Sequence, residues 1–376
     1  MWHGPPARDR TGENRALFSK WYFGPNLPTW ALFAELFVAG LIVVLSGTRL
    51  TRLADTISDR LNLGGALVGL LLLATVTSLP EVVTGATATY IGNVDLAFAG
   101  ILGSCSFNII LIVFLNWLIG GGSILRQGEA THTLTSAFGI ILIAITLAGI
   151  VLIDATAATD LTLAQLMEGL WAILIVATYL VTVSLVCRYE ADKRTLSEEQ
   201  TERQKVEVGT WVQVTVVSLM IVASGWWLAS SGDVLADHEI GILGRPLGAT
   251  IVGVLFLAAA TSLPEIATSV AAVRLGNLNL ALGNIFGSNM FNIFVVPMLK
   301  VTSLARGDEL LMHGADFHLH KNLVAGLLPI LLTAIAAGGL IYHSRRRVLR
   351  RFGFDSVLLA VVYLFGMIML MSMKTS

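Results

Sequence analysis

The sequence has little charge. Only 13% of its 376 residues are Asp, Glu, Lys or Arg, and 55% are hydrophobic, whereas a typical soluble domain is about 25% charged. Apolar runs of about 20 residues, long enough to span a bilayer, recur along the chain. These proportions exclude a large soluble domain and indicate a polytopic membrane protein whose surroundings are the lipid bilayer. We expect no nucleic-acid partner and no obligate protein partner.

Other features are absent as well. The two cysteines, Cys105 and Cys187, lie in apolar sequence 82 residues apart, which suggests neither a disulfide framework nor a metal-ligand pair. The first 28 residues have no apolar core, which argues against a cleaved signal peptide. The chain has no phosphate-binding glycine loop, no nucleophile elbow and no helical H-E-x-x-H motif. We therefore expect neither an enzyme nor a resident cofactor.

The apolar runs predict ten membrane-spanning helices, because backbone polar groups inside lipid must be bonded within their own segment. The structure expected is all-α, with spans near 30–48, 66–90, 96–119, 133–153, 164–187, 210–229, 246–273, 279–299, 322–342 and 355–373. The second and seventh runs are long, and each contains a proline in its middle.

A shift of 184 residues aligns the two halves of the chain without a gap. The stretch TSLPE at 77–81 falls on TSLPE at 261–265, and Gly92-Asn93 falls on Gly276-Asn277. Later in each half, GSCSFN at 103–108 falls on GSNMFN at 287–292. This agreement exceeds what shared apolar composition gives and indicates an internal duplication.

Each half contains five predicted spans. Because five is odd, the second half enters the membrane from the opposite side, which makes an inverted repeat with its site near the midplane. The longest charged stretch, at 188–207, separates the halves and is interpreted as a solvated cytoplasmic linker. The predicted organisation is a polar tail at 1–29, a first five-helix repeat at 30–187, a linker at 188–209 and a second five-helix repeat at 210–376.

The positions of Lys and Arg predict the orientation. With an external amino terminus, the inner loops hold 15 of these residues, against five in the outer loops and carboxyl end once the amino-terminal tail is left out. Inner loops carry the excess of positive charge in membrane proteins. We therefore expect a multi-pass protein of the plasma (inner) membrane with both termini outside.

The prolines of the two TSLPE stretches break their helices just before a carboxylate. Pro80 has no N–H, so the carbonyl of Val76 loses its helical partner, and Pro264 does the same to Ala260. Hydroxyl groups lie at the same level, and Glu81 and Glu265 fall in the first turn of the next half-helix, near its positive end. The helices predicted to be broken around a midplane site are the second and seventh, and also the third and eighth.

The later polar stretches add more oxygen. Ser104 and Asn108 are four residues apart and share a helix face, as do Ser288 and Asn292. If the halves pack face to face, two carboxylates, two amide oxygens and several hydroxyls converge without a basic residue. Such hard oxygen ligands suit Ca²⁺. An ionised carboxylate inside the membrane is costly unless paired, so the counter-charge should be a bound cation or a proton.

Three other interpretations stay open at this point. S-x-x-E is also the capping box of a helix start. The glycines at 103 and 287 could serve close helix packing alone. Two intramembrane carboxylates could act as the acid and base of a membrane-embedded hydrolase, although that chemistry needs no duplicated set of hydroxyl and amide oxygens.

The paired T-S-L-P-E and G-S-x-x-F-N stretches resemble the two alpha-repeats of the sodium/calcium exchanger branch of the cation/calcium antiporter superfamily. The resemblance covers both repeats, at about 64–119 and about 246–300, and fits the ten-helix arrangement. It implies a Ca²⁺ antiporter, usually driven by Na⁺, that works by alternating access. The ion ligands that it implies are Glu81, Glu265, Asn108, Asn292, Thr77, Ser78, Thr261, Ser262, Ser104 and Ser288, with backbone carbonyls near Ala74 and Ala258.

The sequence departs from the family pattern in two ways. Val76 and Ala260 stand where the family usually has Gly before T-S-L-P-E. The second half keeps GNIFGSN at 283–289, whereas the first half reads AGILGSC, with Gly100 and Cys105 in place of the two asparagines. These departures leave the coupling ion open. Exchange of Ca²⁺ or another divalent cation for H⁺ at the same site is the alternative.

Overall fold

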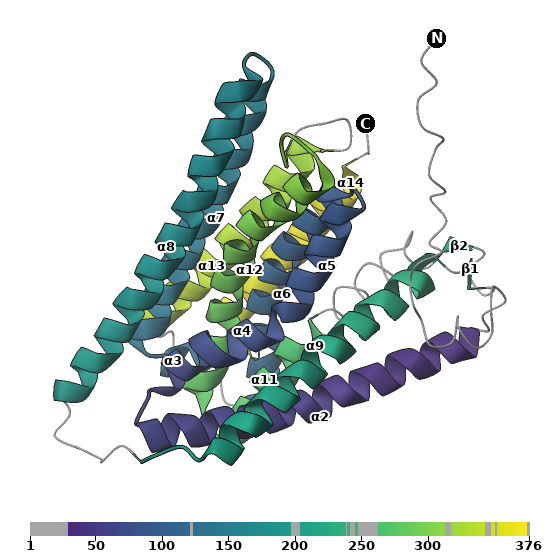
Figure 1. Cartoon of the computed structure of the whole chain (residues 1–376). Helices are drawn as coiled ribbons and strands as arrows, with labels where there is room; N and C mark the ends of the chain where they lie inside the picture. Colours follow the sequence, from purple (N-terminus) through teal and green to yellow (C-terminus); the bar gives the residue numbers. More distant parts are fainter. Residues whose placement is uncertain are drawn as a thin grey trace, which may run out of the picture.

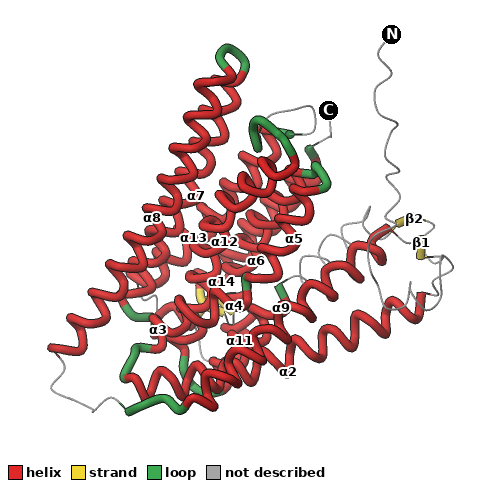
Figure 2. The backbone as a smooth tube through the Cα atoms, in the orientation of Figure 1, coloured by secondary structure: helices red, strands yellow, loops and turns green. Residues whose placement is uncertain are grey.

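The computed structural model describes residues 29–120, 123–196, 204–237, 239–240, 245–246, 262–312, 317–342, 347–349 and 352–373. These residues form an elongated helical bundle (Figure 1). Within these ranges, strands are confined to two short antiparallel pairs, β1 (Glu239–Ile240) with β2 (Arg245–Pro246) and β3 (Arg347–Leu349) with β4 (Phe352–Gly353) (Figure 2).

The first half supplies five spans. The second of them is broken into four short pieces, because a π-helical turn and a proline interrupt it. The elements are α2 (Thr29–Leu61), α3 (Gly65–Val68), η1 (Gly69–Leu73), α4 (Ala74–Thr77), α5 (Leu79–Tyr90), α6 (Val94–Ile119), the 3₁₀ turn η2 (Ile124–Gln127), α7 (Ala130–Ala157) and α8 (Leu161–Leu196).

The second half follows the same plan as far as it is described. The first part of the predicted seventh span, up to residue 261, lies outside the described residues. The helices are α9 (Val208–Asp237), α11 (Leu263–Arg274), α12 (Leu278–Arg306), α13 (Leu319–Tyr342) and α14 (Phe354–Ser372). Within the described ranges, nine helical segments are long and apolar enough to cross a membrane, in agreement with the predicted all-helical membrane fold.

The start of the predicted linker is helical. Helix α8 continues through Leu196, into the segment expected to be solvated. Glu190 is only 1% exposed and accepts a hydrogen bond from Thr131 of α7. The stretch therefore begins as a helix with Glu190 packed against its neighbour, while Arg188, Asp192 and Lys193 are exposed to solvent as expected.

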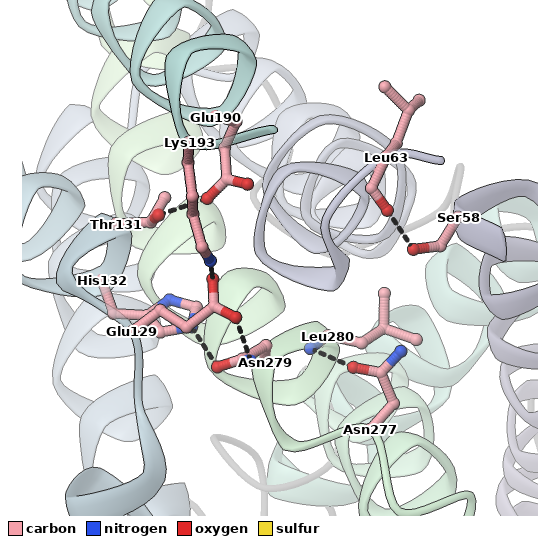
Figure 3. Close-up of polar contacts among 10 residues, drawn as sticks. All are labelled: Ser58, Leu63, Glu129, Thr131, His132, Glu190, Lys193, Asn277, Asn279 and Leu280. Atoms are coloured by element: carbon pink, nitrogen blue, oxygen red, sulfur yellow. Dashed lines mark hydrogen bonds and ion pairs between the residues drawn. The ribbon is translucent and has the colours of Figure 1, made fainter. Parts of the chain in front are cut away.

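One end of the bundle holds Lys193 and Gln204 and is named the linker end. There Glu129 accepts hydrogen bonds from Asn279 of α12 at 2.7 Å and from Lys193 of α8 at 2.6 Å (Figure 3). Asn277 caps α12 by accepting from the Leu280 N–H at 3.0 Å and donates to Asp55 of α2 at 2.8 Å. Four spans are thus joined at this end.

The opposite end joins a different set of loops. Asp95, in the first turn of α6, accepts from Asn322 of α13 at 2.7 Å and pairs with His318. Successive loops therefore lie at alternate ends of the bundle, as they do in a chain that crosses the membrane repeatedly. The loops of the two halves share both ends, as an inverted repeat requires.

Helices α2 and α9 lie side by side and are inclined to the other helices (Figure 1). Glu35 of α2 accepts hydrogen bonds from Ser231 at 3.0 Å and from Trp227 at 3.3 Å, both on α9. Nearer the linker end, Arg60 pairs with Glu207 at 3.3 Å. The pair is therefore held together along its length by polar contacts as well as packing.

Helix α12 lies at the centre of the bundle and crosses the broken second span closely. A Cβ added to Gly69 would come within 2.5 Å of the Leu280 carbonyl oxygen, and one added to Gly287 would come within 2.8 Å of the Leu70 Cα. Glycine lets two helix backbones approach this closely inside a membrane protein. The crossing brings the polar side chains of α12 level with the helix break at Ser78.

Candidate cation-binding site

The first predicted helix break is present, and the second is described only from Ser262 onward, directly before α11. The third and eighth spans, also predicted to be broken, are the continuous helices α6 and α12. Helix α4 ends at Thr77, Ser78 leaves the helical region at φ −90° and ψ 0°, and α5 begins at Leu79 with Pro80 in its first turn. Ser262 has nearly the same backbone angles, φ −92° and ψ 13°, and α11 begins at Leu263. The π-helical turn η1 precedes the first break, and such turns occur often at functional sites.

The capping-box interpretation is wrong. Neither Ser78 nor Ser262 makes a side-chain capping hydrogen bond to the helix that follows it. Instead the Ser78 hydroxyl donates across the repeat to Glu265 Oε1 at 3.5 Å. The serine of the first repeat therefore forms a hydrogen bond with the carboxylate of the second repeat.

The two repeats meet at their polar residues. Ser104 of α6 donates to Glu81 Oε1 at 3.5 Å, and the Thr77 and Ser288 hydroxyls lie 3.4 Å apart. Glu81 and Glu265 are 5% and 1% exposed, so both carboxyl groups are inside the bundle. The contacts are long for hydrogen bonds between oxygens, which leaves the oxygens available to another ligand.

Two asparagines of α12 that were not among the expected ligands hold this site together. Asn284 donates to Thr268 and Ser269 of α11, each at 3.0 Å, and its Oδ1 accepts from Thr77 at 3.4 Å. Asn289 accepts from Asn108 Nδ2 at 3.2 Å. The sequence signal for both was a mismatch between the repeats, because the first half has Gly100 and Cys105 at the equivalent positions.

Most of the unpartnered polar atoms gather at the site. Eleven buried side-chain nitrogen and oxygen atoms of the described residues have no hydrogen-bond partner, although one of them, Glu168 Oε2, is ion-paired, and six belong to expected ligands. Buried polar groups are seldom left unpaired, so their concentration here points to a missing ligand. The six atoms are Glu81 Oε2, Glu265 Oε2, Asn108 Oδ1, Ser262 Oγ and both amide atoms of Asn292.

The chemistry of these atoms fits a hard cation. In the part of the chain that the structure describes, neither Glu81 nor Glu265 has a Lys, Arg or His ion-pair partner. The described part of the chain also contains no group of three or more His, Cys, Asp and Glu side chains that could hold a metal ion. The donors are two carboxylates with amide and hydroxyl oxygens, which Ca²⁺ and similar ions prefer.

Not every expected ligand can be placed. Thr261 and Ala258 lie outside the described residues, as does Ala260. The Ala74 carbonyl accepts the Ser78 N–H at 3.1 Å and also lies 3.5 Å from the Thr77 hydroxyl. The structure links six of the expected side chains in three pairs, Ser78 with Glu265, Ser104 with Glu81 and Thr77 with Ser288. Asn108, Asn292 and Ser262 are buried as well.

A polytopic helical bundle with two broken repeats and a buried oxygen-rich site defines a secondary transporter of cations. The model of the family described as sodium/calcium exchanger protein matches residues 31–188 and 209–372. The chain belongs to this family of cation/Ca²⁺ antiporters. It is a transporter and not an enzyme, which removes the hydrolase interpretation.

Relatives of known name agree with this assignment. The chain is 29% identical over 315 residues to the CaxA protein of Alkalimonas amylolytica, covering 82% of this chain and 92% of that one. It is 28% identical over 270 residues to the inner membrane protein YrbG of Escherichia coli, covering 70% and 77%. The fold matches the sodium/calcium exchanger from Methanococcus jannaschii with a TM-score of 0.58 and 18% identity, covering 90% of this chain and 98% of that one.

Proposed function

We propose that the protein exchanges Ca²⁺ for Na⁺ across the membrane by alternating access. The observation that carries the proposal is the burial of Glu81 and Glu265, one from each repeat, which interact electrostatically among buried oxygens that lack partners. Two carboxylates balance a divalent charge, and the empty ionised site is disfavoured inside the membrane. A site that cannot stay empty releases one cation only when another replaces it.

The ligands proposed are those gathered around the two helix breaks. Glu81 and Glu265 supply the charge, Asn108 and Asn292 supply amide oxygens, and the hydroxyls and backbone complete the shell. The remaining members are Thr77, Ser78, Thr261, Ser262, Ser104 and Ser288, with the carbonyls of Ala74 and Ala258.

Alternating access requires one group of helices to move against another around this site. Helices α2 and α9 are suited to this motion because they meet the site through small residues. A Cβ added to Gly225 of α9 would come within 2.6 Å of the Pro80 ring and 4.0 Å of the Pro264 ring. A glycine that faces both prolines lets α9 slide across both helix breaks.

Flux through proteoliposomes tests the proposal. Uptake of ⁴⁵Ca²⁺ driven by an outward Na⁺ gradient should be abolished by Glu81→Gln and by Glu265→Gln, because each removes half of the charge that balances the cation. Glu207→Gln is the matched control, since that side chain is 76% exposed and far from the site. Gradient-driven uptake at the wild-type rate in both site variants would overturn the proposal.

Exchange of Ca²⁺, or another divalent cation, for H⁺ is the second candidate. It is favoured by the first repeat, where Gly100 and Cys105 replace asparagines and the site has fewer oxygens than the family pattern. The same carboxylates would carry the protons. Imposing a Na⁺ gradient at fixed pH, and then a pH gradient without Na⁺, separates the candidates, because uptake that ignores Na⁺ excludes the first.

A further inference from the structure

The residues at positions 105 and 289 face each other across the repeat. They are equivalent under the 184-residue shift. Asn289 Nδ2 donates to the Cys105 carbonyl oxygen at 3.0 Å, and the Cys105 thiol lies 3.7 Å from the Asn289 carbonyl oxygen. The two backbone contacts are related by the pseudo-two-fold axis of the repeat, so this axis passes between the two residues.

On one side of the axis, a chain of hydrogen bonds fixes the orientation of an amide ligand. A backbone carbonyl can only accept, so the Asn289 amide must point its Nδ2 at Cys105 and its Oδ1 the other way. That Oδ1 accepts from Asn108 Nδ2 at 3.2 Å. Asn108 Oδ1 is consequently turned away from Asn289, and it is one of the unpartnered oxygens at the site.

On the other side the chain ends in a weaker contact. Cys105 stands where a second asparagine would accept from Asn292, and a thiol is only a weak acceptor. Asn292 is fully buried with its side chain against this thiol, and neither its Nδ2 nor its Oδ1 has a nitrogen or oxygen hydrogen-bond partner. Asn108 is thus bonded to another amide and Asn292 only to a thiol, and this contrast follows from the one difference at the axis.

We propose that Asn289 is a positioning residue that holds the Asn108 carbonyl oxygen toward the cation, and that Cys105 holds the equivalent Asn292 only weakly. This inference rests on the cation site of the proposed function. It gives the site one preset amide ligand and one that turns as the cation arrives. The first repeat is thus the stronger half of the amide shell, although its own sequence departs further from the family pattern.

Equilibrium binding of ⁴⁵Ca²⁺ to the purified full-length protein tests the inference. Asn289→Cys places at 289 the residue that the chain already buries at 105. It should raise the half-saturating Ca²⁺ concentration by about tenfold, the effect of about 1.4 kcal/mol of lost ligand interaction. Cys105→Asn should lower that concentration, because it supplies Asn292 with the acceptor that Asn108 has.

A second background separates positioning from structural damage. In Asn108→Asp both terminal atoms of the side chain are oxygens, so no neighbour is needed to turn an oxygen toward the cation. Asn289→Cys should then cost nothing when it is added to Asn108→Asp, whereas an equal tenfold cost in both backgrounds overturns the inference. If the wild-type protein binds no Ca²⁺ in this assay, the proposed function fails as well, which distinguishes that result from failure of the inference alone.

Discussion

At the scale of single residues, the site depends on how near α12 comes to the broken second span. Gly287 immediately precedes Ser288, whose hydroxyl lies 3.4 Å from that of Thr77. This glycine allows close helix packing, since an added Cβ would approach the Leu70 Cα within 2.8 Å. Gly103 differs, because no described atom lies within 4 Å of the corresponding position.

Gly287→Ala should therefore weaken both the fold and the site. The added methyl group meets backbone as well as side chain, and overpacking of this kind costs about 1–3 kcal/mol of stability. We expect a lower melting temperature in detergent and a higher half-saturating Ca²⁺ concentration. Gly169→Ala, on an exposed face of α8 with no described neighbour within 4 Å, is the control and should change neither quantity.

At the scale of elements, α8 and α12 are joined by an ion pair inside the bundle. Lys300 Nζ lies 2.5 Å from Glu168 Oε2, and the two side chains are 12% and 0% exposed. Lys300 also donates to the Glu309 carbonyl at 2.9 Å, while Glu168 Oε1 accepts the Leu311 N–H at 2.8 Å. The pair fixes the loop after α12 as well as the two helices.

Removing one partner of this pair should be costly. A buried charge left alone costs about 3–5 kcal/mol, so Lys300→Met should lower the melting temperature in detergent strongly. The double variant Glu168→Gln with Lys300→Met should recover part of the loss, because it leaves no unpaired charge. A drop for Lys300→Met no larger than that for Glu207→Gln, in the exposed pair with Arg60, would contradict this account.

The contacts between helices could not be predicted from a single sequence. The repeat predicted the helix breaks and the two carboxylates, because Pro and Glu recur at a fixed shift in apolar sequence. It could not predict that Ser78 bonds to Glu265 and not to its own helix, since that depends on how the two breaks face each other. Nor could it show that Glu190 is buried, because burial of a charged residue depends on a neighbouring helix.

At the scale of the whole molecule, the inverted arrangement fixes which loops share a side of the membrane but not which side that is. The linker end and the opposite end are distinguished by their contacts, such as Asn277 with Asp55 and Asn322 with Asp95. The distribution of Lys and Arg remains the argument for placing the linker end in the cytoplasm.

Cysteine labelling in intact cells tests this orientation. In a Cys187→Ser background, Thr159→Cys in the exposed turn between α7 and α8 should react with a membrane-impermeant maleimide added outside. Gln204→Cys, exposed at the linker end, should react only after the cells are permeabilised. The reverse pattern would place both termini in the cytoplasm and would make the predicted orientation wrong.

The position of Cys105 opposite Asn289 also bears on the history of the chain. In a dimer of two identical half-length proteins, a residue on the symmetry axis faces its own copy, so every substitution there appears on both sides at once. A cysteine facing an asparagine cannot arise in such a dimer. The difference at this position therefore dates from after the half-length gene was duplicated, because only two separate copies of the half can be altered on one side only.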